Sequence, residues 1–246
     1  MGLARTGVWL ALLVLWELAW RWGLPQYVLG PVEILKHFYA ALGSQELYSH
    51  IGASLARSLP GFAIGAALGI GLGLAAGVAR SFDRMLSPVI FLTYPVPKIV
   101  MLPLFMLWFG IGDLSKILII GLACFYPMFI NAYTGARATP TILVWSGLNM
   151  GAGRGRLFFR VVVPNALPHI FAGMRVSLAL SFIVMFATEM INARSGLGHL
   201  IRLAENSLRF DLMYVALLCV AILGYAGDRL LRLARGRALA WQESAA

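Results

Sequence analysis

Apolar and polar residues alternate along the chain in long blocks, and the apolar blocks have the length of membrane spans. A spanning helix needs about 20 mainly apolar residues. The pattern predicts such helices over residues 7–24, 58–79, 86–109, 115–136, 170–192 and 211–230. We therefore expect an all-α polytopic membrane protein with about six transmembrane helices.

The polar blocks predict the remaining organisation. The block 25–50 is too polar to span, but VEILKHFYAAL has apolar residues at helical spacing and predicts a short outer surface helix. A similar short surface segment is predicted over SGLGHLIRLAENSLRFD. We interpret its His199 as a loop histidine rather than a ligand. We expect a first span with the surface helix over 1–50, a core over 51–232 that contains a loop over 138–168, and a tail over 233–246.

Composition agrees with a membrane protein. The chain is 60% hydrophobic and 12% charged, with a mean hydropathy of +0.82, which is outside the usual range of soluble domains. A net charge of +10 is compatible with a nucleic-acid partner. However, the basic residues flank apolar runs and form no single face or tail. We therefore predict a lipid bilayer as the environment and no nucleic-acid partner.

The distribution of Lys and Arg predicts the orientation. If the N-terminus lies inside, the inner segments hold more basic residues than the outer ones, above all in the 138–168 loop and the C-terminal tail. Both termini are therefore expected in the cytoplasm. The N-terminal apolar run also has features of a signal peptide, but Trp20, Arg21 and Trp22 stand where a small-residue cleavage site belongs. We interpret it as a retained first span.

The second expected span carries a stripe of glycines with a period of four residues. The stripe is one side-chain-free face of a helix, which lets another helix approach closely. We predict helix packing along it, against either the same chain or a second copy. Its members are Gly61, Gly65, Gly69, Gly73 and Gly77.

The third expected span contains Pro95, Pro97 and Pro103, with Lys98 among them. Proline removes a backbone donor, so this helix should be broken or kinked. Broken backbone and a charge at membrane depth favour a place beside a translocation path. Alternatively, Lys98 snorkels to an interface. Glu189 is likewise interpreted as either interfacial or path-lining, because it lies near the outer end of the fifth span.

Signatures of catalysis are missing from the sequence. There is no HExxH motif, no nucleophile motif and no histidine cluster, so neither catalytic residues nor a metal site is predicted. No phosphate-binding GxxxxGK[ST] loop occurs, so the chain is not itself an ATPase. An ATP-driven permease, an ion-coupled secondary carrier and a membrane-embedded enzyme remain as alternatives at this point.

The loop over 138–168 is too structured in sequence for a linker. TILVWSGLNM predicts two or so helical turns, and the glycines that follow allow a partner to approach the backbone. Pro164 and Pro168 are expected to end a second short helix before the fifth span. The arginines of the loop, Arg154, Arg156 and Arg160, are explained equally by anchoring to lipid phosphates.

The spacing in this loop resembles the conserved loop of ABC importer permeases, which reads EAA, three residues, Gly, nine residues, Ile-x-Leu-Pro. Here Trp145-Ser146-Gly147, Gly151 and Val161-x-Val163-Pro164 stand at that spacing, with Trp145 in place of the family's glutamate. A narrower resemblance is to permeases of the nitrate/sulfonate/taurine group. It rests on LPQYVLGPVEILKHF, HIGASLARSLPGFAIGAALGIGLGLAAG and PKIVMLPLFMLWFGIGDLSKILII.

This resemblance implies the permease of an ATP-driven importer with the type I importer fold, in a bacterial cytoplasmic membrane. It implies a homodimer carrying two cytoplasmic ATPase subunits, which bind the ATP and Mg, and an outer solute-binding protein. This chain is expected to bind no cofactor. The related permeases serve nitrate, sulfonates, taurine, bicarbonate or pyrimidine precursors of thiamine. On this view the ATPase docks on residues 145–156, with the closest contacts at Trp145, Gly147 and Gly151 and polar ones at Arg154 or Arg156.

Overall fold

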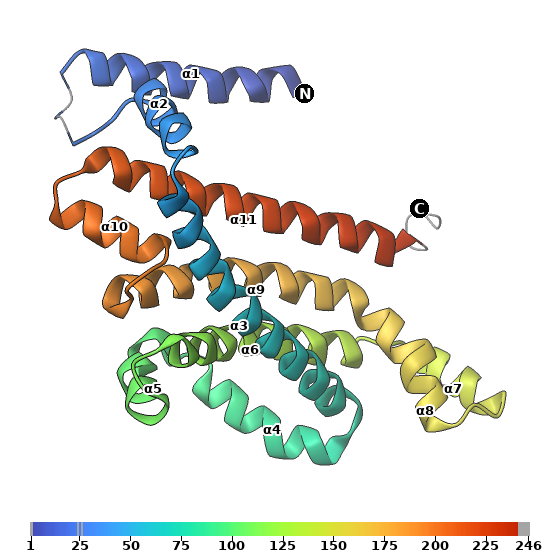
Figure 1. The fold of residues 1–246 in the computed structure, drawn as a ribbon. Coiled ribbons are helices and arrows are strands. Elements are labelled where there is room, and N and C mark those ends of the chain that lie inside the picture. Colours follow the sequence, from blue (N-terminus) through green and yellow to red (C-terminus); the bar gives the residue numbers. More distant parts are fainter. Residues whose placement is uncertain (1, 24, 26, 241–246) are drawn as a thin grey trace. The chain divides into compact units, whose positions relative to one another are not determined.

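The structure, a computed structural model, describes residues 2–23, 25 and 27–240, with side chains from residue 7 onward. Every regular element in these ranges is a helix, which confirms the all-α class (Figure 1). Residue 24 of the first expected span and residues 241–246 of the expected tail lie outside the described residues.

The helices follow one another with short connections. A 3-10 turn and a π-helical segment interrupt the α-helices at two places. The elements are α1 Gly2–Arg21, α2 Pro31–Ala41, α3 Gln45–Val78, α4 Arg80–Thr93, the 3-10 turn Lys98–Met101, α5 Leu102–Phe109, α6 Asp113–Arg137, α7 Thr141–Asn149, α8 Arg154–Leu157, the π-helical segment Phe158–Val162, α9 Val163–Asn192, α10 Leu197–Asn206 and α11 Phe210–Ala238.

The expected spans correspond to helices. Among the described residues, four helices are long and apolar enough to cross a bilayer, namely α3, α6, the continuous helix Arg154–Asn192 and α11. A fifth span is formed if α4 is joined to Lys98–Phe109, a pair bent by 92°. These five cover the second to sixth expected stretches, and α1 covers most of the first. The predicted break in the third span is confirmed.

The helix α3 begins earlier than the apolar pattern predicts. Its first residue is Gln45, whereas the expected span begins at residue 58. Leu47, His50 and Ser54 are buried, and their spacing places them on one face of the helix. The polar block 25–50 is therefore not wholly a surface segment, because packing of this face extends the helix beyond its apolar run.

The chain forms two compact units. Unit 1 comprises Met1–Leu55 and Glu189–Ile222, and unit 2 comprises Ala56–Thr188 and Leu223–Ala246. The helices α3, α9 and α11 contribute residues to both units. The division of the chain at residue 50 stays a prediction.

In unit 1, the carboxylate of Glu17 joins α1 to α2. It accepts a hydrogen bond from the Arg21 guanidinium at 2.9 Å and another from the backbone N–H of Val32 at 3.2 Å. Val32 lies in the first turn of α2, where N–H groups have no partner within the helix and favour a negative charge. Pro31 begins this helix, and its missing N–H costs nothing at that position. Glu17 thus caps α2.

The helix α10 is the other short helix of unit 1. One face is buried through Leu197, Leu200 and Ile201, in agreement with an amphipathic helix. His199 lies on this helix rather than in a loop, with its ring 6.0 Å from that of His50. Partial burial, followed by the positive charge of Arg202, lowers the pKa of His199.

In unit 2, α6 is the central helix. More than half of its apolar window is buried, the largest share among the candidate spans. Side chains from α5 and α9 pack against it around Leu102, Ile120 and Met185, all of which are inaccessible to solvent. A second apolar cluster joins α3, α6 and the start of α9 through Leu74, Ala132, Val162, Ala166 and Ile170.

The glycine stripe of α3 lies against α6. A Cβ added at Gly61 would lie 2.7 Å from a side-chain carbon of Ile120, and one at Gly69 would lie 2.7 Å from the carbonyl oxygen of Phe125. Equivalent clashes occur at Gly65, Gly73 and Gly77. The two backbones approach each other so closely that no side chain fits between them. The partner of this face is therefore a helix of the same chain.

Replacing Gly69 by leucine should destabilise the fold, because the side chain has to displace α6. Overpacking costs about 1–3 kcal/mol. Gly71 is the matched control, since a Cβ there meets nothing within 4 Å. In an exposed helical position leucine is better than glycine, so Gly71→Leu should leave stability unchanged or slightly raised. Thermal unfolding of the purified protein in detergent measures both, and equal melting temperatures for the two variants would contradict the packing role of the stripe.

Candidate functional site

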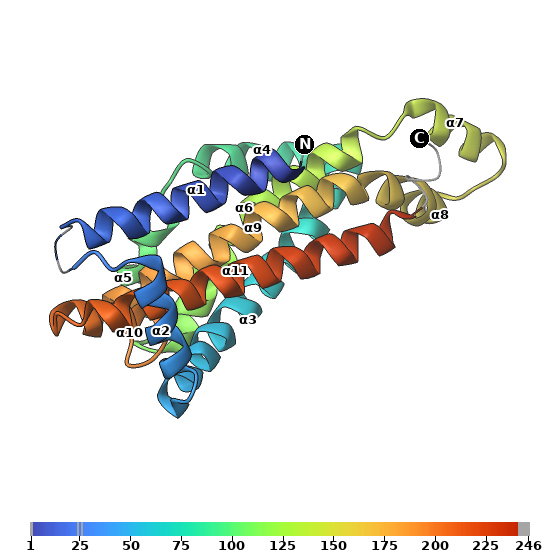
Figure 2. The same cartoon turned by 90° about the horizontal axis from the view of Figure 1, so that it is seen from above.

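The expected docking loop folds as two short helices, α7 and α8, which lie at the N-terminal end of α9 (Figure 1 and Figure 2). The first, α7, exposes large apolar side chains. Ile142 and Trp145 are 68% and 63% exposed, and Met150, directly after the helix, is 86% exposed. Exposed apolar groups of this size concentrated on one short helix are typical of a surface that contacts a partner.

A glycine-dependent turn ends α7. Gly151 has φ of +77°, a left-handed conformation in which other residues are strained. Its N–H donates to the carbonyl of Leu148, and the N–H of Ala152 donates to the carbonyl of Gly147, both at 2.9 Å. This pair of hydrogen bonds is the Schellman motif that closes many helices. The glycine at the family position therefore has a conformational role in this chain, whatever else contacts it.

Gly147 has an internal role as well. A Cβ at this position would collide with the side chain of Leu157, which is buried. The absence of a side chain thus lets α7 pack on α8. Ser146, by contrast, is exposed, as are Arg154 and Arg156 on α8. Of the residues expected to contact a partner, Trp145, Ser146 and the two arginines are the ones with accessible side chains.

The expectation that Pro164 and Pro168 end a helix is wrong. Pro164 lies in the first turn of α9 and Pro168 lies inside it, and the helix is continuous from Arg154 to Asn192. Pro168 lies inside α9 itself, whereas Pro164 is tolerated because of the preceding π-helical segment Phe158–Val162. Its wider turns relieve the clash of a proline ring with the preceding carbonyl and absorb the missing donor. The loop therefore connects to the fifth span as one helix.

The second candidate region is the break in the third span. The helix α4 ends at Thr93 and the chain resumes helical structure at Lys98, after Pro95 and Pro97. Pro103 lies in the first turn of α5, where its missing N–H has no cost. A pocket of about 340 Å³ lies beside the break, lined on the opposite side by residues of α6 and α9.

Lys98 binds the open end of α4. Its ammonium group donates to the carbonyl oxygens of Thr93, Tyr94 and Val96 at 2.8, 3.0 and 2.7 Å. It also lies 3.9 Å from the centre of the Tyr126 ring, within the range of a cation–π interaction. A cation at this position compensates carbonyls that the break leaves without helical partners. Lys98 also lines the pocket, so a role in a path stays a prediction.

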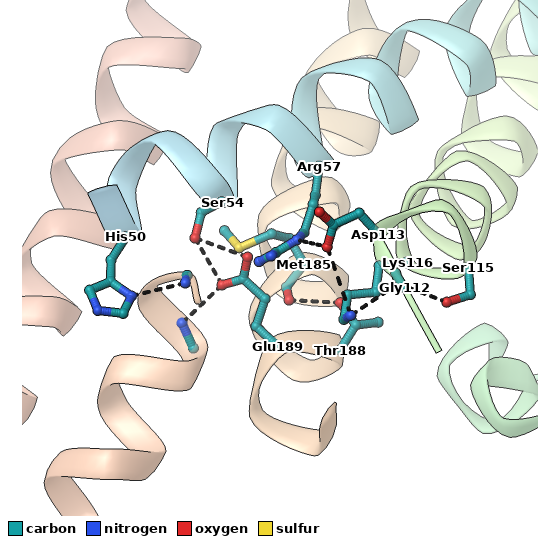
Figure 3. A network of polar contacts seen from close by, with 12 residues as sticks. His50, Ser54, Arg57, Gly112, Asp113, Ser115, Lys116, Met185, Thr188 and Glu189 are labelled. Atoms are coloured by element: carbon teal, nitrogen blue, oxygen red, sulfur yellow. Dashed lines mark hydrogen bonds and ion pairs between the residues drawn. The ribbon is translucent and has the colours of Figure 1, made fainter. Parts of the chain in front are cut away.

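Glu189 is buried in unit 1, where its carboxylate connects α3 with α10 through hydrogen bonds. Its carboxylate is inaccessible to solvent and accepts hydrogen bonds from the Ser54 hydroxyl at 2.8 and 3.0 Å and from the Gly198 N–H at 3.0 Å (Figure 3). Next to it, the N–H of Gly196 donates to His50 Nδ1 at 3.0 Å. These contacts hold the start of α10 on α3. A path-lining role for Glu189 stays a prediction.

Sequence reasoning missed a buried ionic group in unit 2. Arg57 directly precedes the second expected span and Lys116 stands at the start of the fourth, yet their side chains are only 5% and 4% exposed. Arg57 donates to the Asp113 carboxylate at 2.7 Å, and Lys116 donates to the Gly112 carbonyl at 3.0 Å (Figure 3). A signal was present, because Arg57 stands four residues before Gly61 and thus shares the face of the glycine stripe.

Comparison with known proteins connects these features to a family. The family described as binding-protein-dependent transport system inner membrane component matches residues 54–238. The chain is 36% identical over 231 residues to the putative aliphatic sulfonates transport permease protein SsuC of Escherichia coli, covering 92% of this chain and 88% of that protein. It is 31% identical to the taurine transport system permease protein TauC of the same organism, covering 88% and 81%.

The chain is also similar to a further permease and to a solved structure. The riboflavin transport system permease protein RibX of Chloroflexus aurantiacus is 38% identical, with 86% of this chain and 80% of that protein covered. Among solved structures, a chain of the MetNI methionine ABC transporter in inward-facing conformations matches with a TM-score of 0.66 and 21% identity. The match covers 76% of this chain and 95% of that one. It supports the type I importer fold expected from the sequence.

Replacing Lys98 by methionine should lower stability, since methionine keeps the length of the side chain but leaves three carbonyl oxygens without their donor. A lost hydrogen bond to a charged group costs about 1.5–3 kcal/mol. Lys98→Arg, which retains the charge and donors, is expected to keep most of the stability. Thermal unfolding in detergent gives the comparison. If Lys98→Met unfolds at the temperature of the parent protein, Lys98 does not stabilise the break.

Proposed function

Since the chain belongs to the family of binding-protein-dependent transport system inner membrane components, we propose that it forms the translocation path for a small sulfonate. It is a multi-pass inner membrane protein and the permease subunit of an ATP-driven importer, not an enzyme. ATP hydrolysis belongs to a separate ATPase subunit, and a solute-binding protein delivers the solute. An ion-coupled carrier is not favoured.

The observation that carries the choice of solute is the similarity to two sulfonate permeases. SsuC is described as a permease for aliphatic sulfonates and TauC as one for taurine, which is itself an aminosulfonate. Each similarity extends over nearly nine-tenths of this chain or more. Riboflavin is the second candidate, because RibX shows a comparable identity.

The pocket beside the α4 break supports a path at that place. Its walls include Pro95, Pro97 and Lys98, with Tyr94 and Tyr126 among otherwise mainly apolar residues. Irregular backbone at membrane depth is tolerated where protein buries it or where it lines a cavity. A pocket with apolar walls and one cation suits a solute with a short hydrocarbon part and an anionic head. On this proposal the solute passes Lys98.

The exposed face of α7 supports docking of the ATPase. Trp145 and Ile142 lie three residues apart, so they share one face, and Ser146 extends it. Gly147 and Gly151 contribute through the fold of the loop, while Arg154 or Arg156 supplies polar contacts. Because α8 continues into α9 through Pro164 and Pro168, a displacement of α7 would be transmitted to the fifth span as movement of one helix. We extend this proposal to a dimer of the chain carrying two ATPases.

The charge distribution supports the orientation. With both termini in the cytoplasm, the loop over 138–168 and the basic end of α11 lie on the inner side, as the positive-inside rule requires. This orientation also places α7 on the side where an ATPase has access to it. The docking proposal thus depends on the assignment of both termini to the cytoplasm.

The proposed solute is tested by uptake into proteoliposomes that contain the chain, its ATPase and its binding protein. We expect ATP-dependent uptake of labelled taurine or a short alkanesulfonate, blocked by vanadate and insensitive to an uncoupler. Riboflavin is supplied in parallel. Uptake of riboflavin without uptake of a sulfonate would replace the proposed solute by the second candidate, and uptake abolished by the uncoupler alone would favour a carrier.

Truncation of Trp145 tests the docking surface. Hot-spot aromatic residues typically contribute 2 kcal/mol or more to an interface, so Trp145→Ala should weaken binding of the ATPase by about thirty-fold. Tyr39→Ala is the control, because Tyr39 is 70% exposed but lies on α2. Co-purification of the ATPase at graded concentrations measures the loss. Equal retention by Trp145→Ala and Tyr39→Ala would place the ATPase elsewhere on the chain.

A further inference from the structure

Behind the exposed face of α7 lies a cavity in unit 2. Its volume is about 590 Å³. It is enclosed by the last turns of α3 and α6, by α7, and by α8 with the π-helical segment. Its lining residues are Gly77, Val78, Ala79, Ala136, Arg137, Thr139, Val144, Leu148, Arg154, Leu157, Phe158 and Val162.

The cavity is lined by a face of α7 that is not part of the proposed docking surface. Val144 and Leu148 line it and stand four residues apart, so they share one face of the helix. Ile142 and Trp145 are exposed and do not line it. An occupant of the cavity would therefore sit beneath α7 while an ATPase covers its outer face.

The walls are too apolar to hold water well. A water molecule occupies about 30 Å³ of liquid and needs two to four polar partners. A cavity of 590 Å³ has room for many waters, but most of its lining consists of aliphatic and aromatic side chains. Leu148 and Val78 are 43% and 52% exposed, so the apolar wall is incompletely covered by the chain itself. Hydrocarbon is the chemistry that matches these walls.

The charged residues of the lining are two arginines, with no carboxylate among them. Arg137 is compensated, because its guanidinium lies 3.0 Å from the Asp83 carboxylate and donates to the Tyr133 hydroxyl. The Arg154 side chain has no hydrogen bond or ion pair with any residue that the structure describes. The cavity therefore combines apolar walls with one uncompensated cation, and a second cation nearby.

We propose that this cavity binds one anionic phospholipid of the cytoplasmic leaflet, with part of an acyl chain against Val78, Leu148 and Phe158 and the phosphate on Arg154. Basic pockets on the cytoplasmic side of membrane helices suit anionic headgroups. The bound lipid would join α7 to the ends of α3 and α6 and so stiffen the docking element. This inference rests on the proposed orientation, which places the loop over 138–168 in the cytoplasm.

Lipid binding is measured on the delipidated complex of the chain with its ATPase. Phosphatidylglycerol, phosphatidylcholine and water-soluble glycerol phosphate are added separately, and bound molecules are counted by native mass spectrometry. We expect one saturable phosphatidylglycerol per chain, weaker binding of phosphatidylcholine, and no displacement by glycerol phosphate. Equal binding of the two lipids would overturn the proposal. Displacement by glycerol phosphate would assign the site to a free phosphate ester and overturn the lipid as its source.

Two matched pairs of variants locate the site. Arg154→Gln should weaken phosphatidylglycerol binding by about five-fold, as expected for one arginine near an anionic lipid. Arg156→Gln is its control, because Arg156 is on the same short helix but does not line the cavity. Val78→Trp fills the cavity without changing a charge, and Val89→Trp is the control on α4, where Val89 is 57% exposed outside the cavity.

The readouts distinguish this proposal from the proposed function. Val78→Trp should lose the lipid while the ATPase still co-purifies, because Val78 lies on α3 and not on the exposed face of α7. If Arg154→Gln loses the ATPase but keeps the lipid, Arg154 is a docking residue and the lipid site is wrong. Equal effects of Arg154→Gln and Arg156→Gln would indicate general surface attraction and would also overturn it. If sulfonate uptake fails, the expected numbers of bound phosphatidylglycerol and phosphatidylcholine molecules stay the same, so the two proposals are tested independently.

Discussion

Helices in a bilayer are held together by close packing, because lipid removes the hydrophobic driving force between them. In this chain the closest packing is that of α3 on α6, where five glycines allow the two backbones to meet. The cores of unit 2 are built around the helix that this contact holds. Leu102 and Met185 pack on α6 around Ile120, and Leu74, Ala132 and Ile170 join α6 to α3 and α9.

A second constraint is that backbone groups at membrane depth need partners within the protein. The chain meets it differently at its two irregular sites. At the break after α4, the ammonium group of Lys98 binds three carbonyl oxygens, so a charge replaces missing helical donors. Before α9, a π-helical segment precedes Pro164, and the helix remains continuous. Proline thus accompanies a bend of 92° in one place and a continuous helix in the other.

The loop between α6 and α9 shows how one motif combines conformation with surface chemistry. Gly151 closes α7 in a left-handed turn, and Gly147 gives room to Leu157. These two positions shape the loop from within, which leaves Trp145 and its neighbours on α7 as the accessible part. At position 145, where the family pattern has an acidic residue, this chain therefore presents an exposed apolar side chain. The cavity lined by Val144 and Leu148 lies on another face of the same helix.

The apolar pattern by itself determined the helical class, and the prolines determined the break at Pro95–Lys98, because these depend on hydropathy and on local backbone chemistry. The apolar pattern predicted about six spans, whereas the described residues contain four helices that qualify, or five if the bent pair counts as one span. The period of the glycine stripe determined that a close helix contact exists. Only the tertiary structure decided that α6 is its partner, that α3 begins at Gln45, and that Arg57, Lys116 and Glu189 are buried. It also decided that Pro164 and Pro168 lie in a continuous helix. These outcomes depend on which side chains meet across distant segments, and a linear pattern does not contain that information.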